Sequence, residues 1–64
     1  MARYPGLTAT DPTTGNIWVC IGGSDRLGWQ WCWVGPREGT FYALETADTP
    51  AHPSLGRALE HSNG

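Results

Sequence analysis

Lysine is absent from this sequence, and its only basic residues are four scattered arginines: Arg3, Arg26, Arg37 and Arg57. With six acidic residues, equally scattered, the net charge is −2. Binding to a nucleic-acid backbone or to an anionic membrane depends on clustered positive charge, so we expect neither. The missing lysine, together with frequent glycine, alanine, proline and tryptophan, suggests a GC-rich genome such as that of an actinobacterium or one of its phages.

Long hydrophobic runs are also absent. No apolar stretch approaches the ~20 residues that a membrane-spanning helix requires, and Met1 to Gly6 form no hydrophobic segment of signal-peptide length. We therefore expect a cytoplasmic protein. Charged residues make up 16% of the chain and apolar residues 39%, which indicates a folded protein rather than a disordered one.

The 64 residues are enough for one domain over 1–64, with flexible ends at 1–6 and 62–64. A domain of this length buries only about 60% of the surface that its unfolded chain exposes. Such domains usually depend on a disulfide, a metal, a partner subunit or very dense packing. The four tryptophans are the largest side chains available for that packing.

Stretches rich in β-branched and aromatic residues predict strands at 7–10, 16–21, 29–34 and 40–44. The segment 11–15, Asp-Pro-Thr-Thr-Gly, is typical of a hairpin turn that ends in a glycine bulge. Gly22 to Gly28 is expected to be a loop and Gly35 to Gly39 a turn. Because all these connections are short, neighbouring strands should be antiparallel.

A short helix is predicted near the C-terminus. Leu55, Ala58 and Leu59 have the spacing of one helical face, and Pro53 suits the first turn with His52 or Ser54 near the cap. The fold class is thus mostly β (α+β): a four-stranded antiparallel meander, able to curl into a partial barrel, with a short C-terminal helix. The alternative is a three-stranded sheet with an irregular N-terminal arm.

Trp29, Trp31 and Trp33 occupy every second position, so a strand places them on one face. We expect Cys20 to pair with Cys32, and a tight turn to pair Trp33 with Phe41. One face then contains Val19, Ile21, Trp29, Trp31, Trp33, Phe41 and Ala43. The other contains Trp18, Cys20, Cys32, Val34, Tyr42 and Leu44. Both faces are apolar, and the single helix is expected to cover the face of Trp18, Val34 and Leu44.

Two interpretations of the tryptophan face are open. The indoles either fill a core or form an exposed platform for a partner, since aromatic residues and arginine are enriched at protein interfaces. For the second interpretation we predict a partner-binding set of Trp29, Trp31, Trp33 and Phe41, with Arg26 and Arg37 at the rim in the flanking loops.

The two cysteines also have two interpretations. Cys20 and Cys32 lie close enough for a disulfide if they are opposite one another on adjacent strands, whereas a reducing cytoplasm keeps both as thiols. Their spacing to His52 and His61 does not match a zinc site. No spacing of nucleophile, base and acid indicates catalysis. We expect no metal, no cofactor and no enzymatic activity.

These observations predict a small protein-interaction module that binds a protein partner or a second copy through an aromatic sheet face or edge. A phage-type modulator or inhibitor of a host protein fits the size and composition. One alternative is a ligand-binding module that stacks a sugar or single-stranded nucleic acid on exposed tryptophans. Another is a small structural subunit of an assembly.

Overall fold

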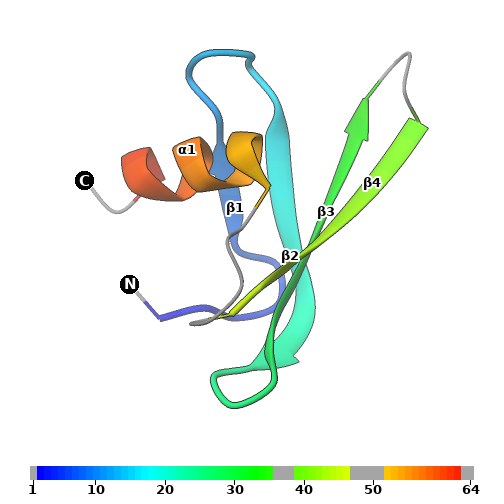
Figure 1. Ribbon diagram of the computed structural model, residues 1–64, viewed down its shortest axis with the longest axis vertical. Coiled ribbons are helices and arrows are strands. Elements are labelled where there is room, and N and C mark those ends of the chain that lie inside the picture. Colours follow the sequence, from blue (N-terminus) through cyan, green and yellow to red (C-terminus); the bar gives the residue numbers. More distant parts are fainter. Residues whose placement is uncertain (1, 36–38, 47–51, 63–64) are drawn as a thin grey trace.

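The computed structural model describes residues 2–35, 39–46 and 52–62. Its strands are β1 (Thr8–Thr10), β2 (Ile17–Ser24), β3 (Gly28–Gly35) and β4 (Gly39–Glu45), and its helix is α1 (Pro53–Ser62) (Figure 1). The strands form one antiparallel sheet in the order β1-β2-β3-β4, which confirms the predicted meander and C-terminal helix. The sheet is twisted and open rather than closed into a barrel, so β1 and β4 are its edges.

The turn between β1 and β2 forms as predicted. The Thr13 N–H donates to Asp11 Oδ1 over 2.9 Å, and the Gly15 N–H donates to the Asp11 carbonyl oxygen over 2.7 Å. Gly15 has a φ of +80°, in the left-handed region that glycine adopts without a steric penalty. The side chain of Asp11 thus shapes the turn from inside.

The hairpin of β2 and β3 is longer than predicted, because most of the segment expected as a loop belongs to its ladder. Next to the turn the pairs are Ser24↔Gly28, Gly23↔Trp29 and Gly22↔Gln30. A bulge between Cys20 and Gly22 then shifts the register, so that the following pairs are Cys20↔Trp31 and Val19↔Cys32. Gly22 and Gly23 have φ values of +151° and +125°, which favour glycine and allow the strand to continue through the bulge.

The predicted pairing of Cys20 with Cys32 is therefore wrong. One extra residue in β2 turns every side chain before it to the opposite face of the sheet. Trp18 and Cys20 consequently lie on the same face as Trp31 and Trp33, which we call the inner face. Beyond β3 the predicted register is confirmed, since Trp33 pairs with Phe41 and Cys32 with Tyr42.

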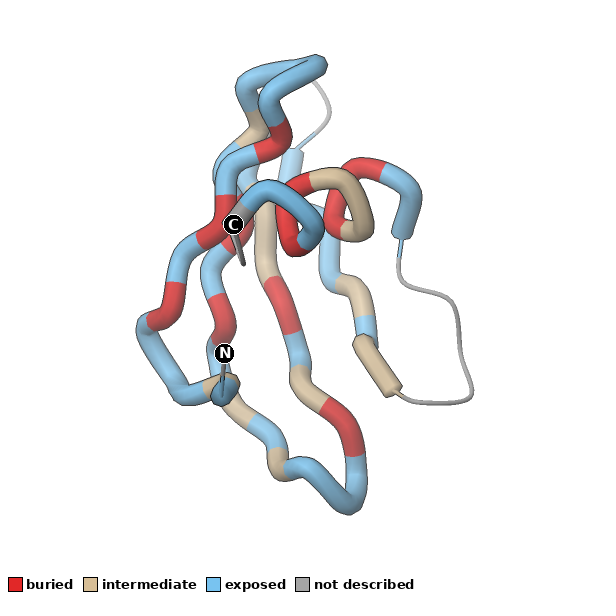
Figure 2. The backbone as a smooth tube through the Cα atoms, turned by 90° about the vertical axis from the view of Figure 1, so that its left-hand side faces the viewer, coloured by how far each residue is buried: buried red, intermediate tan, exposed pale blue. Residues whose placement is uncertain are grey.

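The core lies between the inner face and α1, which packs on β1 and, less extensively, on β2. Buried positions are coloured red in Figure 2, and the apolar residues among them are Leu7, Ala9, Trp18, Cys20, Trp31, Leu55, Ala58 and Leu59. The predicted apolar face of the helix is confirmed. The expectation that α1 covers Val34 and Leu44 is wrong, because the bulge places Trp18 on the inner face and leaves those two residues on the other.

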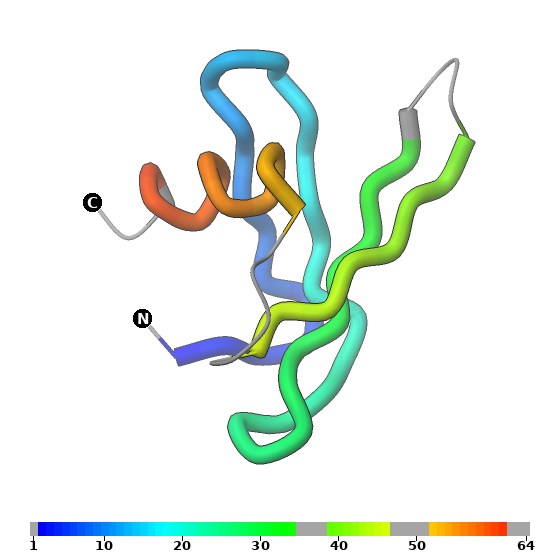
Figure 3. Tube along the Cα trace, viewed as in Figure 1, coloured from blue at the N-terminus to red at the C-terminus, as the bar shows by residue number. Residues whose placement is uncertain are grey.

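The N-terminal arm runs alongside the end of β4 (Figure 3). Arg3 donates two hydrogen bonds to the carboxylate of Glu45, over 3.0 and 2.8 Å, and the Gly6 N–H donates to the carbonyl oxygen of Cys20 over 2.8 Å. These contacts attach a segment that the sequence predicts to be flexible. Of the predicted flexible C-terminus, residues 63–64 lie outside the described residues.

Candidate functional site

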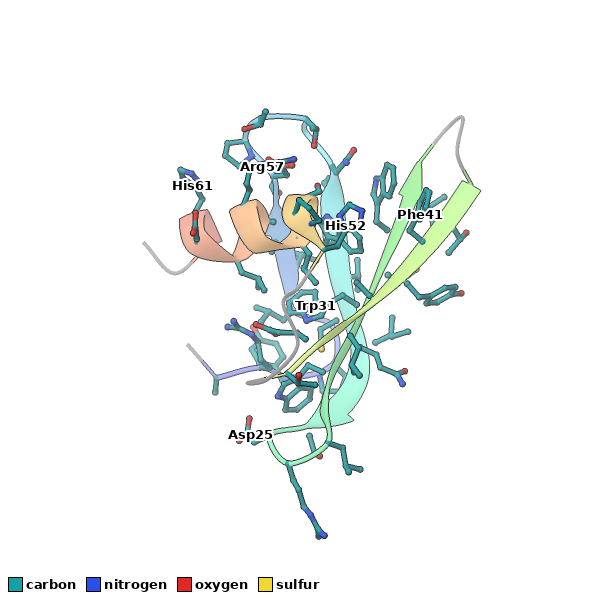
Figure 4. All side chains as sticks on the ribbon, in the orientation of Figure 1. Asp25, Trp31, Phe41, His52, Arg57 and His61 are labelled. Carbon is teal, nitrogen blue, oxygen red and sulfur yellow. The ribbon has the colours of Figure 1, made fainter. Side chains whose placement is uncertain are left out.

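Trp31 belongs to the core and has no exposed surface. Its indole Nε1 donates to Glu45 Oε1 over 3.1 Å, and the residue lies at the centre of the molecule in Figure 4. Trp29 and Trp33 are half-buried and pack against the core, and Trp29 Nε1 donates to Asp25 Oδ1 over 3.1 Å. Trp31 thus lies in the core, as one interpretation predicted, whereas Trp29 and Trp33 are buried only in part.

Four aromatic rings contact one another on the inner face beside the start of α1. Trp33 stacks on Phe41 with ring centroids 5.0 Å apart and an interplanar angle of 16°. Trp18 lies 5.9 Å from Trp33 and 5.5 Å from His52, with tilted planes. His52, just before α1, and Phe41 on β4 approach each other with ring centroids 6.5 Å apart (Figure 4). The rings therefore cover one another instead of presenting a flat row of indoles to solvent.

The predicted partner-binding residues do not form one surface. Trp33 and Phe41 are in contact, but Trp29 pairs with Glu45, four positions or about 13 Å further along β3. Arg26 is exposed in the turn between β2 and β3, at the end of the sheet remote from Phe41. Arg37 lies outside the described residues.

The cysteines are free thiols on opposite faces. Cys20 points inward and is buried, whereas Cys32 is half-buried on the face away from α1. A disulfide between neighbouring strands requires both side chains on the same face. The predicted disulfide is therefore incompatible with this register.

A buried polar cluster joins α1 to the turn between β1 and β2. Asp11 has no exposed surface, and its carboxylate accepts from the Ser54 hydroxyl at 2.8 Å, the Thr14 hydroxyl at 2.9 Å and the Arg57 guanidinium at 3.0–3.2 Å. The hydrogen bonds from Arg57, reinforced by those from Ser54 and the turn, hold the pKa of Asp11 well below its usual value despite its burial.

Ser54 is committed to this cluster. Its oxygen accepts from Trp18 Nε1 at 3.2 Å and from Asn16 Nδ2 at 3.3 Å, while its own proton goes to Asp11. Its backbone N–H donates to His52 Nδ1 at 3.1 Å, so His52 caps the helix as predicted. A hydroxyl with these contacts and 4% exposure anchors the helix and has no lone pair or proton left for nucleophilic chemistry.

The face away from α1 has no covering element among the described residues. On it lie five exposed apolar side chains, which we call the outer apolar face: Ile17 (55% exposed), Val19 (36%), Val34 (68%), Tyr42 (70%) and Leu44 (45%). The intervening strand positions of this face are uncharged as well, namely Thr8, Thr10, Gln30, Cys32 and Thr40. Such a surface is suited to contact with another apolar surface.

Two recesses lie beside β4. One, of about 350 Å³, is lined by Gln30, Tyr42, Ala43 and Leu44 at the free edge of the outer apolar face. The other, of about 320 Å³, lies near the N-terminal arm and is lined by Ala2, Arg3, Asp25, Gly28, Trp29, Glu45 and Thr46. The first recess adjoins the outer apolar face, whereas the second contains the Arg3–Glu45 ion pair.

The residues of the outer apolar face are not among the predicted partner-binding residues. The alternation of Thr40, Tyr42 and Leu44 against Phe41 and Ala43 is visible in the sequence, and it separates the two faces of β4. The sequence pattern does not indicate that the bulge in β2 places Trp18 on the inner face. The prediction placed the helix on the face of Trp18, Val34 and Leu44 because Leu55 and Leu59 suit a flat aliphatic surface.

Comparison with protein families, with curated proteins and with solved structures finds no match to this chain. Within the described residues, no helix is long and apolar enough to span a membrane. The same residues hold no group of three or more histidine, cysteine, aspartate or glutamate side chains placed to bind a metal ion.

Proposed function

We propose that this protein is a non-enzymatic protein-interaction module whose contact surface is the outer apolar face. The observation that supports the proposal is the exposure of five apolar side chains on one uncharged sheet face. A sheet face of this composition normally packs against another element of the same or another molecule. Here α1 packs on the inner face and no other described element covers the outer apolar face, so we assign its cover to a partner protein.

The size of the face suits this role. Three strands of seven or eight residues and one of three, about 4.8 Å apart and rising about 3.3 Å per residue, give a sheet face of about 400 Å². Contiguous apolar patches of about 300–600 Å² on soluble proteins are often functional. An inhibitor or modulator of a host protein remains the specific form of this proposal that the size and composition favour.

The alternatives have less support. Stacking of a sugar or a single-stranded nucleic acid needs exposed indole faces, whereas Trp31 is buried and Trp33 is stacked on Phe41. A net charge of −2 also opposes nucleic-acid binding. Catalysis by Ser54 is disfavoured because its hydroxyl and its partner Asp11 are held in structural hydrogen bonds.

A photoreactive phenylalanine analogue at position 34, on the outer apolar face, tests the proposal. The control places the same analogue at position 27, because Leu27 is as exposed (75%) as Val34 (68%) but lies in the turn between β2 and β3. Both labelled proteins are irradiated alone and in an extract of the source cells. We expect a discrete cross-linked product from position 34 and none from position 27.

Competition makes the result specific. Unlabelled wild-type protein should suppress the product from position 34, whereas unlabelled Val19→Asp protein should not, because it places a charge in the middle of the face. Absence of a discrete product from position 34, or equal products from both positions, would overturn the proposal.

A further inference from the structure

β4 is an unprotected edge of the sheet. From Thr40 to Leu44 it has five consecutive uncharged residues and no proline. Phe41 on the inner face and Tyr42 and Leu44 on the outer face are all exposed. Within the described residues no strand lies beyond β4, so the main-chain groups that alternate away from β3 face outward.

The opposite edge of the sheet differs. β1 has only three residues, and α1 packs on it. Natural proteins protect edge strands by shortness, charge, proline, bulges or a covering element, because a bare edge pairs with other strands. β4 has seven residues, and its one charged side chain, Glu45, lies at the end and is bound by Arg3 and Trp31. A long edge strand without these protections is suited to pair with a strand of another molecule.

We propose that β4 pairs antiparallel with β4 of a second copy of this chain, joining the two sheets into one. The inference goes beyond the proposed function: the second copy adds to the edge of the sheet, so the outer apolar face extends across both copies and stays available to a partner protein. Strand addition at a sheet edge is a general mode of protein recognition, in which main-chain hydrogen bonds bind and alternate side chains select.

The sequence of β4 is complementary to itself. An antiparallel two-fold pairing keeps each face of the strand on the same face of the joined sheet. With the axis at Tyr42, this residue meets its own copy, Thr40 meets Leu44, and Phe41 meets Ala43. No like charges meet, and each large side chain except Tyr42 faces a smaller one, which favours cross-strand packing.

The recess of about 350 Å³ provides space for side chains of the second β4 strand. It is formed by Gln30, Tyr42, Ala43 and Leu44 at the free edge, where outer-face side chains of an added strand arrive. Because Thr40 to Leu44 are uncharged, two copies of β4 meet without charge repulsion. A chain of 64 residues also has the small core for which a partner subunit is a common source of stability.

Sedimentation equilibrium of the purified chain, from micromolar to millimolar concentration, tests the proposal. We expect a monomer–dimer equilibrium. Tyr42→Lys should weaken dimerisation by about tenfold or more, because it places two like charges opposite each other at the joint. Val19→Lys is the matched control, since it adds the same charge to the same face on β2 and should change dimerisation by no more than about threefold. Thr40→Lys replaces Tyr42→Lys if that variant does not fold.

Hydrogen exchange provides the second measurement. Amides of β4 that do not bond to β3 should become protected as the concentration of wild-type protein rises, and those of β1 should not. A chain that stays monomeric over the whole range, or a dimer without this protection, overturns the inference. The proposed function stands if position 34 still cross-links to a different protein. It also stands if Val19→Lys dissociates the dimer while Tyr42→Lys does not, because the two copies would then meet through the outer apolar face. If position 34 yields no cross-link either, both fail.

Discussion

Ser54 donates a hydrogen bond of 2.8 Å from its hydroxyl to the buried carboxylate of Asp11, 43 positions earlier in the chain. This contact joins the first turn of α1 to the turn between β1 and β2. Arg57, one helical turn further on, donates to the same carboxylate. The helix is thus oriented by polar contacts as well as by its apolar face.

Asp11→Asn should lower the melting temperature at neutral pH by at least about 5 °C, because the charge partner of Arg57 is lost. It should also flatten the acid limb of the stability curve. The pKa of Asp11 is lower in the folded than in the unfolded chain, so its stabilisation is complete above pH ~4 and is lost as the pH falls toward the folded value. Thermal unfolding followed by circular dichroism at a series of pH values measures both effects.

Asp25→Asn is the control for this prediction. It removes the same charge from an exposed site, where the carboxylate accepts from Trp29 Nε1. We expect a small change in the melting temperature at neutral pH, because this side chain is exposed. Parallel acid limbs for Asp11→Asn and the wild type would contradict the role assigned to Asp11.

Ser54→Ala should lower the free energy of unfolding by about 1–3 kcal/mol, because it leaves the buried Trp18 Nε1 without its acceptor and removes a donor to Asp11. Urea unfolding measures the change. Ser24→Ala is the control, since the Ser24 hydroxyl accepts from the exposed Leu27 N–H and its loss should cost about 0.5 kcal/mol. Equal losses would show that Ser54 has no special structural role.

Gly23→Ala should destabilise the protein more than Gly22→Ala, although both glycines have positive φ. A Cβ at Gly23 would collide with the Gly28 carbonyl oxygen and lie 2.8 Å from Trp29 Cα, whereas a Cβ at Gly22 would meet nothing within 4 Å. We expect an additional loss of at least ~2 kcal/mol for Gly23→Ala. Urea unfolding of the two variants decides the point, and equal losses would contradict the close approach of β2 and β3.

The thiols should react at different rates. Cys32 is half-buried on the outer apolar face and should be alkylated by iodoacetamide in the native protein. Cys20 is buried on the inner face and should react at least ~100-fold more slowly, through opening of the structure. Peptide mapping by mass spectrometry assigns each site. Equal rates, or a mass increase on reduction that reveals a disulfide, would contradict the register of β2 and β3.

Much of the fold could be predicted from local residue patterns. Asp11 and Gly15 define the first turn, and the spacing of Leu55, Ala58 and Leu59 defines the helix and its buried side. The register of β3 and β4 follows from a short turn and regular alternation. These features depend on contacts between residues close in the chain, for which sequence spacing and intrinsic conformational preference are sufficient information.

The site was only partly predictable. That the sheet has two apolar faces and that only one is covered by the helix is evident from composition and strand alternation. The bulge at Ile21 is not evident from the sequence, because the two possible strand registers differ by a single residue and the local sequence permits both. The selected register places the indole of Trp18 under α1 and leaves Val34 and Leu44 on the outside.

The sequence by itself determined the elements, their order and the apolar character of both sheet faces, since these depend on side-chain type and local spacing. Only the tertiary structure decided which face is the core. Trp18 on the inner face packs in the buried cluster with Leu55 and reaches Ser54, which in turn bonds Asp11. That choice needs residues more than 30 positions apart to meet, and burial of the largest side chain with its polar N–H satisfied favours the bulged register.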